Sequence, residues 1–153
     1  YLKLRDYKGG LTYTRWFSKN FPDDVGFPDF LFEWAVILFI NGKLKEAERK
    51  ATECYFSNVY LFDKFFRRPI EPIVEMAVYS NVSEPNYLND FPYSSSDEWL
   101  ESFSKWLADF EGSEKFKSIT KRYIDAQIRL KDEDDPETRH LLVRVYRQLL
   151  DEV

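Results

Sequence analysis

Apolar side chains recur every three to four residues along most of the chain, which is the spacing of one face of an α-helix. The pattern is clearest from Pro28 to the Asn41-Gly42 pair, a typical helix end. Strand-like alternation is nearly absent, so we predict an all-α fold built from antiparallel helical hairpins. The helices are expected at about residues 11–17, 28–41, 44–55, 58–66, 96–112, 113–130 and 136–150.

Several predicted helices carry recognisable start signals. Pro28 suits the first turn of a helix, and Ser113 and Asp135 stand where a side chain can cap the free backbone N–H groups of the next helix. Ser95, three residues before Glu98, has the spacing of a capping box. These signals place four helix starts from local sequence alone.

The stretch from residue 69 to 95 differs from the rest because Pro69, Pro72, Pro85 and Pro92 break any long period. It is nevertheless rich in apolar and aromatic residues, which a solvated linker is not. We predict an irregular connection packed onto the body. The whole chain, 1–153, is therefore expected to form a single helical domain, with hairpins at 5–60 and C-terminal helices at 96–152.

Composition and charge narrow the classes of partner. The 28 aromatic residues among 153 can fill a core, and the net charge of −5 argues against nucleic acid as a partner. The most apolar run, 30–40, has eleven residues and contains Glu33, whereas a membrane span needs about 20, so no membrane partner is expected. The chain begins with Tyr1, which indicates trimming, and no secretory pattern remains. We expect a cytoplasmic protein.

An ordered spacing of small and large residues surrounds Gly42. Ala35 and Ala47 are small where two helices would cross closely, and the chain would turn at Gly42. The run from Asn41 to Glu48 and its surroundings resemble the tetratricopeptide repeat, a helix–turn–helix unit of about 34 residues. A fainter copy precedes it. The resemblance covers residues 5–60 and rests on Leu31, Trp34, Ala35, Leu38, Gly42, Leu44, Glu46, Ala47, Ala51 and Cys54, with Asp6, Tyr7, Lys8, Gly9, Gly10, Tyr13, Thr14, Phe17 and Pro22 in the copy.

The resemblance implies a superhelical stack of hairpins whose concave face binds a protein or peptide. Carried onto this sequence, the partner-binding positions are Asp29, Phe32, Val36, Phe39 and Ile40. The alternative is that the four apolar residues among them are buried by C-terminal helices folding back onto them. The Lys and Asn side chains that clamp a terminal carboxylate in that family are missing at these positions, so that ligand is not expected.

Motifs for catalysis, metals or cofactors are not found. Cys54 lies on an apolar helix face as a core filler, and His140 has no nucleophile or metal partner at a fixed spacing. The sequence has no nucleophile elbow and no phosphate-binding glycine loop. We therefore predict a non-enzymatic protein without cofactor or metal.

Two further hypotheses remain open at this point. The first is a small-ligand or carbohydrate-binding domain that uses exposed aromatic side chains at Tyr87, Phe91 and Tyr93. The second is an enzyme with paired carboxylates in the middle segment, which would require two converging groups with raised pKa values. The leading hypothesis is a scaffold that binds a protein or peptide.

Overall fold

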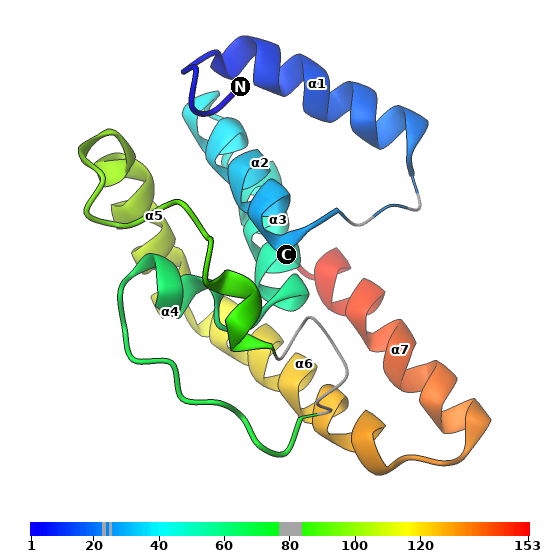
Figure 1. Cartoon of the computed structure of the whole chain (residues 1–153). Helices are drawn as coiled ribbons and strands as arrows, with labels where there is room; N and C mark the ends of the chain where they lie inside the picture. Colours follow the sequence, from blue (N-terminus) through cyan, green and yellow to red (C-terminus); the bar gives the residue numbers. More distant parts are fainter. Residues whose placement is uncertain (23, 25, 77–83) are drawn as a thin grey trace.

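The computed structural model of the chain describes residues 1–22, 24, 26–76 and 84–153. Within these residues the chain forms seven α-helices and no β-strand, which confirms the all-α prediction (Figure 1). Two short 3₁₀ helices, η2 and η3, precede α5. The elements are α1 (Tyr7–Asn20), α2 (Pro28–Ile40), α3 (Leu44–Ser57), α4 (Leu61–Phe65), η2 (Pro85–Leu88), η3 (Glu98–Leu100), α5 (Glu101–Gly112), α6 (Glu114–Asp132) and α7 (Pro136–Asp151).

Helices α2 and α3 form an antiparallel hairpin that turns at Gly42, as the sequence predicts. The Gly42 N–H donates to the Phe39 carbonyl and the Lys43 N–H to the Leu38 carbonyl, both at 2.9 Å. These are the two hydrogen bonds of a Schellman motif, which needs a left-handed residue after the helix. Gly42 supplies it with φ of 72°. The small residues Ala35 and Ala47 are both buried, so the two helices can pack closely.

Local capping sets three of the helix starts. The Ser113 hydroxyl accepts the Phe116 N–H at 3.2 Å at the start of α6, and Asp135 accepts the Thr138 N–H at 2.8 Å at the start of α7. Both caps were predicted. Asp6 caps α1 by accepting the Gly9 N–H at 2.9 Å.

The predicted capping box of Ser95 and Glu98 is wrong. The chain enters its next helix through η3, and Asp97 stands at the N-cap of that 3₁₀ turn. The Asp97 carboxylate accepts the Ser94 N–H at 2.9 Å, while the Ser95 N–H donates to the carbonyl of Phe65 at 2.8 Å. The backbone of Ser95 thus ties the chain to α4, and no hydrogen bond of its side chain caps α5 among the described contacts.

A second hairpin, α6 with α7, packs against α3 (Figure 1). The rings of Phe56 and Tyr123 stack with centroids 3.9 Å apart, and the Tyr123 hydroxyl donates to the Phe56 carbonyl at 2.8 Å. Arg49 of α3 donates to the carbonyl of Leu150 at 2.7 Å. The C-terminal turn of α7 is thereby held beside α3, close to the connection between α1 and α2.

The irregular connection between α4 and α5 packs onto the body over the residues that the structure describes. The Ile73 N–H donates to the hydroxyl of Tyr60 at 2.7 Å, and Met76, Leu88 and Tyr93 are buried. The side chain of Val74, by contrast, is exposed. Residues 77–83 of the predicted connection lie outside the described part of the chain.

One cluster of buried side chains extends from Leu2 to Leu150 and includes residues of helices α2 to α7. Tyr7 and Leu11 of α1 are partly buried and pack against this cluster. At its centre Phe32 contacts three other aromatic rings of the cluster, Phe65, Tyr93 and Phe103, at centroid distances of 4.9, 5.5 and 5.5 Å. None of the described helices combines the length and apolar character that a membrane crossing requires.

Candidate functional site

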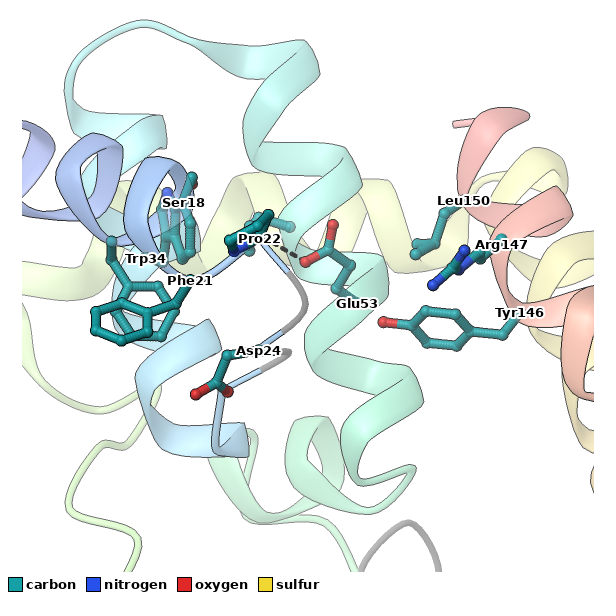
Figure 2. Close-up of a pocket in the computed structure, with 11 residues that line it drawn as sticks. Ser18, Phe21, Pro22, Asp24, Trp34, Glu53, Tyr146, Arg147 and Leu150 are labelled. Carbon is teal, nitrogen blue, oxygen red and sulfur yellow. Dashed lines mark hydrogen bonds and ion pairs between the residues drawn. The ribbon is translucent and has the colours of Figure 1, made fainter.

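A cleft lined by four helices lies where the C-terminal end of α7 meets the α1–α2 connection (Figure 2). This cleft has a volume of about 300 Å³. Because α1, α2, α3 and α7 all contribute to it, its walls are fixed by packing between distant parts of the chain. Its lining residues are Phe17, Ser18, Phe21, Pro22, Asp24, Trp34, Lys50, Glu53, Tyr146, Arg147 and Leu150.

A charged pair on α3 forms the floor of the cleft. Lys50 makes an ion pair with Glu53, and its ammonium nitrogen lies 3.8 Å from the ring centroid of Trp34. The two charged side chains are only 15% and 14% exposed. Arg49 places Nε 3.8 Å from the other oxygen of Glu53, so this carboxylate lies between two cations. The charges of the floor therefore largely cancel one another.

The α7 side of the cleft carries a neutral hydroxyl and an unneutralised cation. Figure 2 shows the Tyr146 hydroxyl pointing toward Glu53, with Arg147 beside it. Burial, helped by the negative charge of Glu53, raises the pKa of Tyr146 to about 12. The phenol is thus a hydrogen-bond donor at physiological pH. Arg147 is exposed and makes no ion pair with any residue in the described part of the chain.

The α1 side of the cleft is aromatic and continues onto the molecular surface. Four rings follow one another there with centroids 5.4, 5.8 and 5.7 Å apart, and we name them the aromatic ladder: Tyr1, Tyr13, Trp16 and Phe21. All four are exposed, Trp16 to 51%. Phe21 also lines the cleft and contacts Phe17 at 5.3 Å. Phe21 therefore joins the ladder to the cleft.

The five positions predicted to bind a partner do not come together in one groove. Phe32 and Val36 are buried, so the structure corrects the expectation that they line a surface groove. Phe39 is half-buried against Trp106 at a centroid distance of 5.1 Å, and Ile40 is exposed. Asp29 is exposed and lines a smaller cavity of about 190 Å³ with Tyr87 and Phe91.

The physical reason for this correction is that the chain covers its own α2. Tyr93 lies parallel to Phe32, and Phe91 meets the same ring edge-on at 5.1 Å. The Tyr93 hydroxyl donates to the Glu33 carboxylate. Burial raises the pKa of that tyrosine, and the hydrogen bond to Glu33 adds to the rise. The face of α2 expected to receive a partner is occupied by the connection, together with α5.

The structure also answers part of the small-ligand hypothesis. Tyr93 is 5% exposed, so it is wrong as an exposed aromatic platform, and Phe91 is half-buried. Tyr87 is exposed at the rim of the small cavity. This leaves one accessible ring of the three that were proposed.

Neither of the two residues considered for catalysis lines the cleft. The thiol of Cys54 is fully buried and donates to the Pro28 carbonyl at 3.4 Å; burial raises its pKa well above the usual value. His140 is exposed on α7. In the described part of the chain no three His, Cys, Asp or Glu side chains converge in a way that could hold a metal ion.

Sequence reasoning missed the cleft because its residues are spread from position 17 to 150. One local signal was available, since residues 1–20 carry five basic side chains and one acidic one within an acidic chain. With the cleft described, comparison with known proteins gives no match: no family model, no curated protein and no solved structure is similar to this chain.

Proposed function

We propose that the chain is a non-enzymatic helical module of tetratricopeptide repeat-like type that binds a protein or peptide in the cleft and on the aromatic ladder. The observation that carries this proposal is the continuity of the four exposed rings with a cleft of about 300 Å³. Exposed aromatic side chains are enriched at protein interfaces, and contiguous apolar patches mark them.

The repeat-like part of the proposal is supported by the α2–α3 hairpin. Its Gly42 turn and its buried Ala35 and Ala47 fulfil the structural roles that the repeat spacing implies. Helix α1 packs on α2, as the second helix of a preceding unit would. The binding surface, however, differs from the one the resemblance implies, because the connection covers Phe32.

The proposed partner is a protein segment because the surface offers the cleft next to the aromatic ladder. A cleft of this volume accommodates one or two bulky side chains, while the ladder provides flat contacts on its α1 side. The Tyr146 hydroxyl and Arg147 would supply polar contacts that fix the orientation of the segment. The buried thiol of Cys54 and the isolated His140 give no reason to propose a reaction.

Selection from a library of displayed random peptides tests this function. We expect the chain to select peptides whose binding falls about tenfold in the double variant Trp16→Ala/Phe21→Ala, since exposed aromatic anchors carry most of the energy of such contacts. The matched control is Leu141→Ala/Val143→Ala, which removes two apolar side chains that are each 61% exposed on α7, away from the cleft lining. Binding is measured by fluorescence anisotropy of labelled selected peptides.

Two results would contradict the proposal. One is a selection that yields no binding peptide. The other is equal loss of binding in the Trp16/Phe21 variant and in the Leu141/Val143 control. Thermal unfolding of both variants shows whether each remains folded, since all four positions are exposed and their truncation should change stability little.

A further inference from the structure

The exposed face of α1 carries a stripe of cations beside the aromatic ladder. Lys8, Arg15 and Lys19 are separated by seven and four residues, which places them on one line along an α-helix. All three are exposed. With a rise of about 1.5 Å per residue the stripe spans roughly 16 Å. We name these three residues the cationic stripe.

The stripe is not neutralised by the rest of the molecule. Neither its three members nor Lys3 and Arg5 make an ion pair within the part of the chain that the structure describes. The one acidic residue among the first 20, Asp6, already accepts the Gly9 N–H as the cap of α1. Several cations elsewhere are paired, although Lys45 of α3 and Arg129 of α6 are not: Lys43, Arg49, Lys50, Lys105, Lys117, Lys121 and Arg122 each contact a carboxylate.

The rings lie beside the cationic stripe, on the neighbouring face of α1. Trp16 is one helical turn from Lys19, and Tyr13 stacks on Trp16 farther around the helix from the stripe. The ladder leads into the cleft through Phe21, and Arg147 at the α7 side of the cleft is a further cation without an ion pair among the described residues. A ligand that follows the ladder into the cleft has the cationic stripe along one edge of its path and Arg147 at the α7 wall, and inside the cleft it also meets the exposed carboxylate of Asp24.

We propose that α1 and the adjoining cleft bind an acidic segment of a partner protein, in which Asp or Glu residues flank a bulky apolar side chain. This inference rests on the proposed function and specifies the chemistry of the partner. The carboxylates would pair with the cationic stripe and with Arg147, and the apolar side chain would contact the ladder and enter the cleft. Charge complementarity of this kind chiefly gives specificity and fast association.

A short acidic segment fits the charge distribution better than a long polyanion. Beyond residue 20, acidic residues outnumber basic ones by 26 to 17, whereas residues 1–20 carry five basic residues and one acidic residue. At physiological ionic strength charges more than about 8 Å apart are largely screened. A short segment would therefore respond to the stripe alone, whereas a nucleic acid or an anionic lipid surface would extend over the acidic remainder of the protein.

The composition of selected peptides tests the inference. We expect the wild-type chain to select displayed peptides enriched in Asp and Glu next to Trp, Phe, Leu or Met, with binding that weakens as salt is raised. In the variant Lys8→Gln/Arg15→Gln/Lys19→Gln these peptides should bind about tenfold more weakly. The matched control Lys45→Gln/Lys64→Gln/Arg129→Gln removes two Lys and one Arg that likewise make no ion pair among the described residues, and it should bind like wild type.

Three outcomes would overturn the inference. Selected peptides without acidic enrichment, but still dependent on Trp16 and Phe21, would retain the proposed function and refute the acidic partner. Equal weakening in the stripe variant and in its control would refute the role of the stripe. Binding of oligo-deoxythymidine or of phosphatidylserine vesicles through the stripe, with no binding of acidic peptides, would assign the surface to nucleic acid or lipid. Circular dichroism confirms that both variants are folded.

Discussion

Lys50 and Trp34 form a cation–π contact across the hairpin, with the ammonium nitrogen 3.8 Å from the ring centroid. The contact joins α3 to α2 at the edge of the cleft, and Glu53 holds the ammonium from the other side. This arrangement fixes the position of the one indole in the cleft lining. It also means that the cleft presents no free lysine at its floor.

The first prediction concerns this contact. A double-mutant cycle with Lys50→Gln and Trp34→Leu should give a coupling energy of about 0.5–1 kcal/mol, because a half-buried cation–π pair contributes about that much. Urea unfolding of the four proteins measures it. A control cycle combines Trp34→Leu with Lys45→Gln. The side chain of Lys45 is exposed and lies elsewhere on α3, so this cycle should give no coupling energy. A zero value for Lys50 as well would show that the contact contributes nothing to stability.

The second prediction concerns alkaline pH. The pKa of Tyr146 is raised from 10.0 to about 12 by burial, so the folded state holds this proton more tightly than the unfolded state. Its contribution to stability is therefore present below pH 10 and is lost as the pH rises from about 10 to 12. Stability of Tyr146→Phe should fall less steeply than that of wild type over this window. Urea unfolding at a series of pH values measures both slopes, and identical slopes would contradict the buried phenol.

The third prediction concerns Gly42. Valine at this position should destabilise the protein by about 1–2 kcal/mol, because a β-branched residue is disfavoured at φ of 72°. No atom lies within 4 Å of the site where a Cβ would be added, so the backbone alone accounts for the expected loss. Gly112→Ala is the control. Gly112 is helical and, like Gly42, has open space where a Cβ would be added, so alanine there should stabilise the protein slightly. Thermal unfolding compares the two, and an unchanged midpoint in Gly42→Val would refute the strained turn.

The fold could be predicted wherever a few neighbouring residues decide it. The Gly42 turn and the Ser113 and Asp135 caps depend on hydrogen bonds between residues at most five positions apart, and the sequence shows all of them. The Ser95–Glu98 cap failed because a non-local partner, the Phe65 carbonyl, takes the Ser95 N–H. Local spacing alone contains no information about that partner.

The site could not be predicted for the same reason. Apolar residues on α2 were recognised as a face, but spacing does not reveal whether that face binds a partner or another part of the chain. The irregular connection covers it with Phe91 and Tyr93, which lie about 60 residues away in sequence. Likewise, the cleft needs α7 to return beside α1, and no periodicity in either helix indicates this pairing.

The fourth prediction concerns the cap of α6. Replacing Ser113 by Ala should cost about 1 kcal/mol, because the Phe116 N–H loses the hydroxyl that accepts it at 3.2 Å. Ser118→Ala is the matched control, since Ser118 is an exposed residue inside the same helix and alanine is the better helix former. Urea unfolding measures both. Equal stability of the two variants would show that the cap has no energetic role.

The last prediction concerns the self-covered face of α2. Tyr93→Ala should destabilise the protein by about 3–5 kcal/mol, because it removes a buried ring that stacks on Phe32 with centroids 5.5 Å apart. Tyr93→Phe keeps the ring and removes only the hydrogen bond to Glu33, so its loss should be smaller, about 1–2 kcal/mol. Urea unfolding gives the ratio of the two losses. If Tyr93→Ala unfolds like wild type, the connection does not cover α2 in solution, and Phe32 with Val36 returns as a surface that a partner can reach.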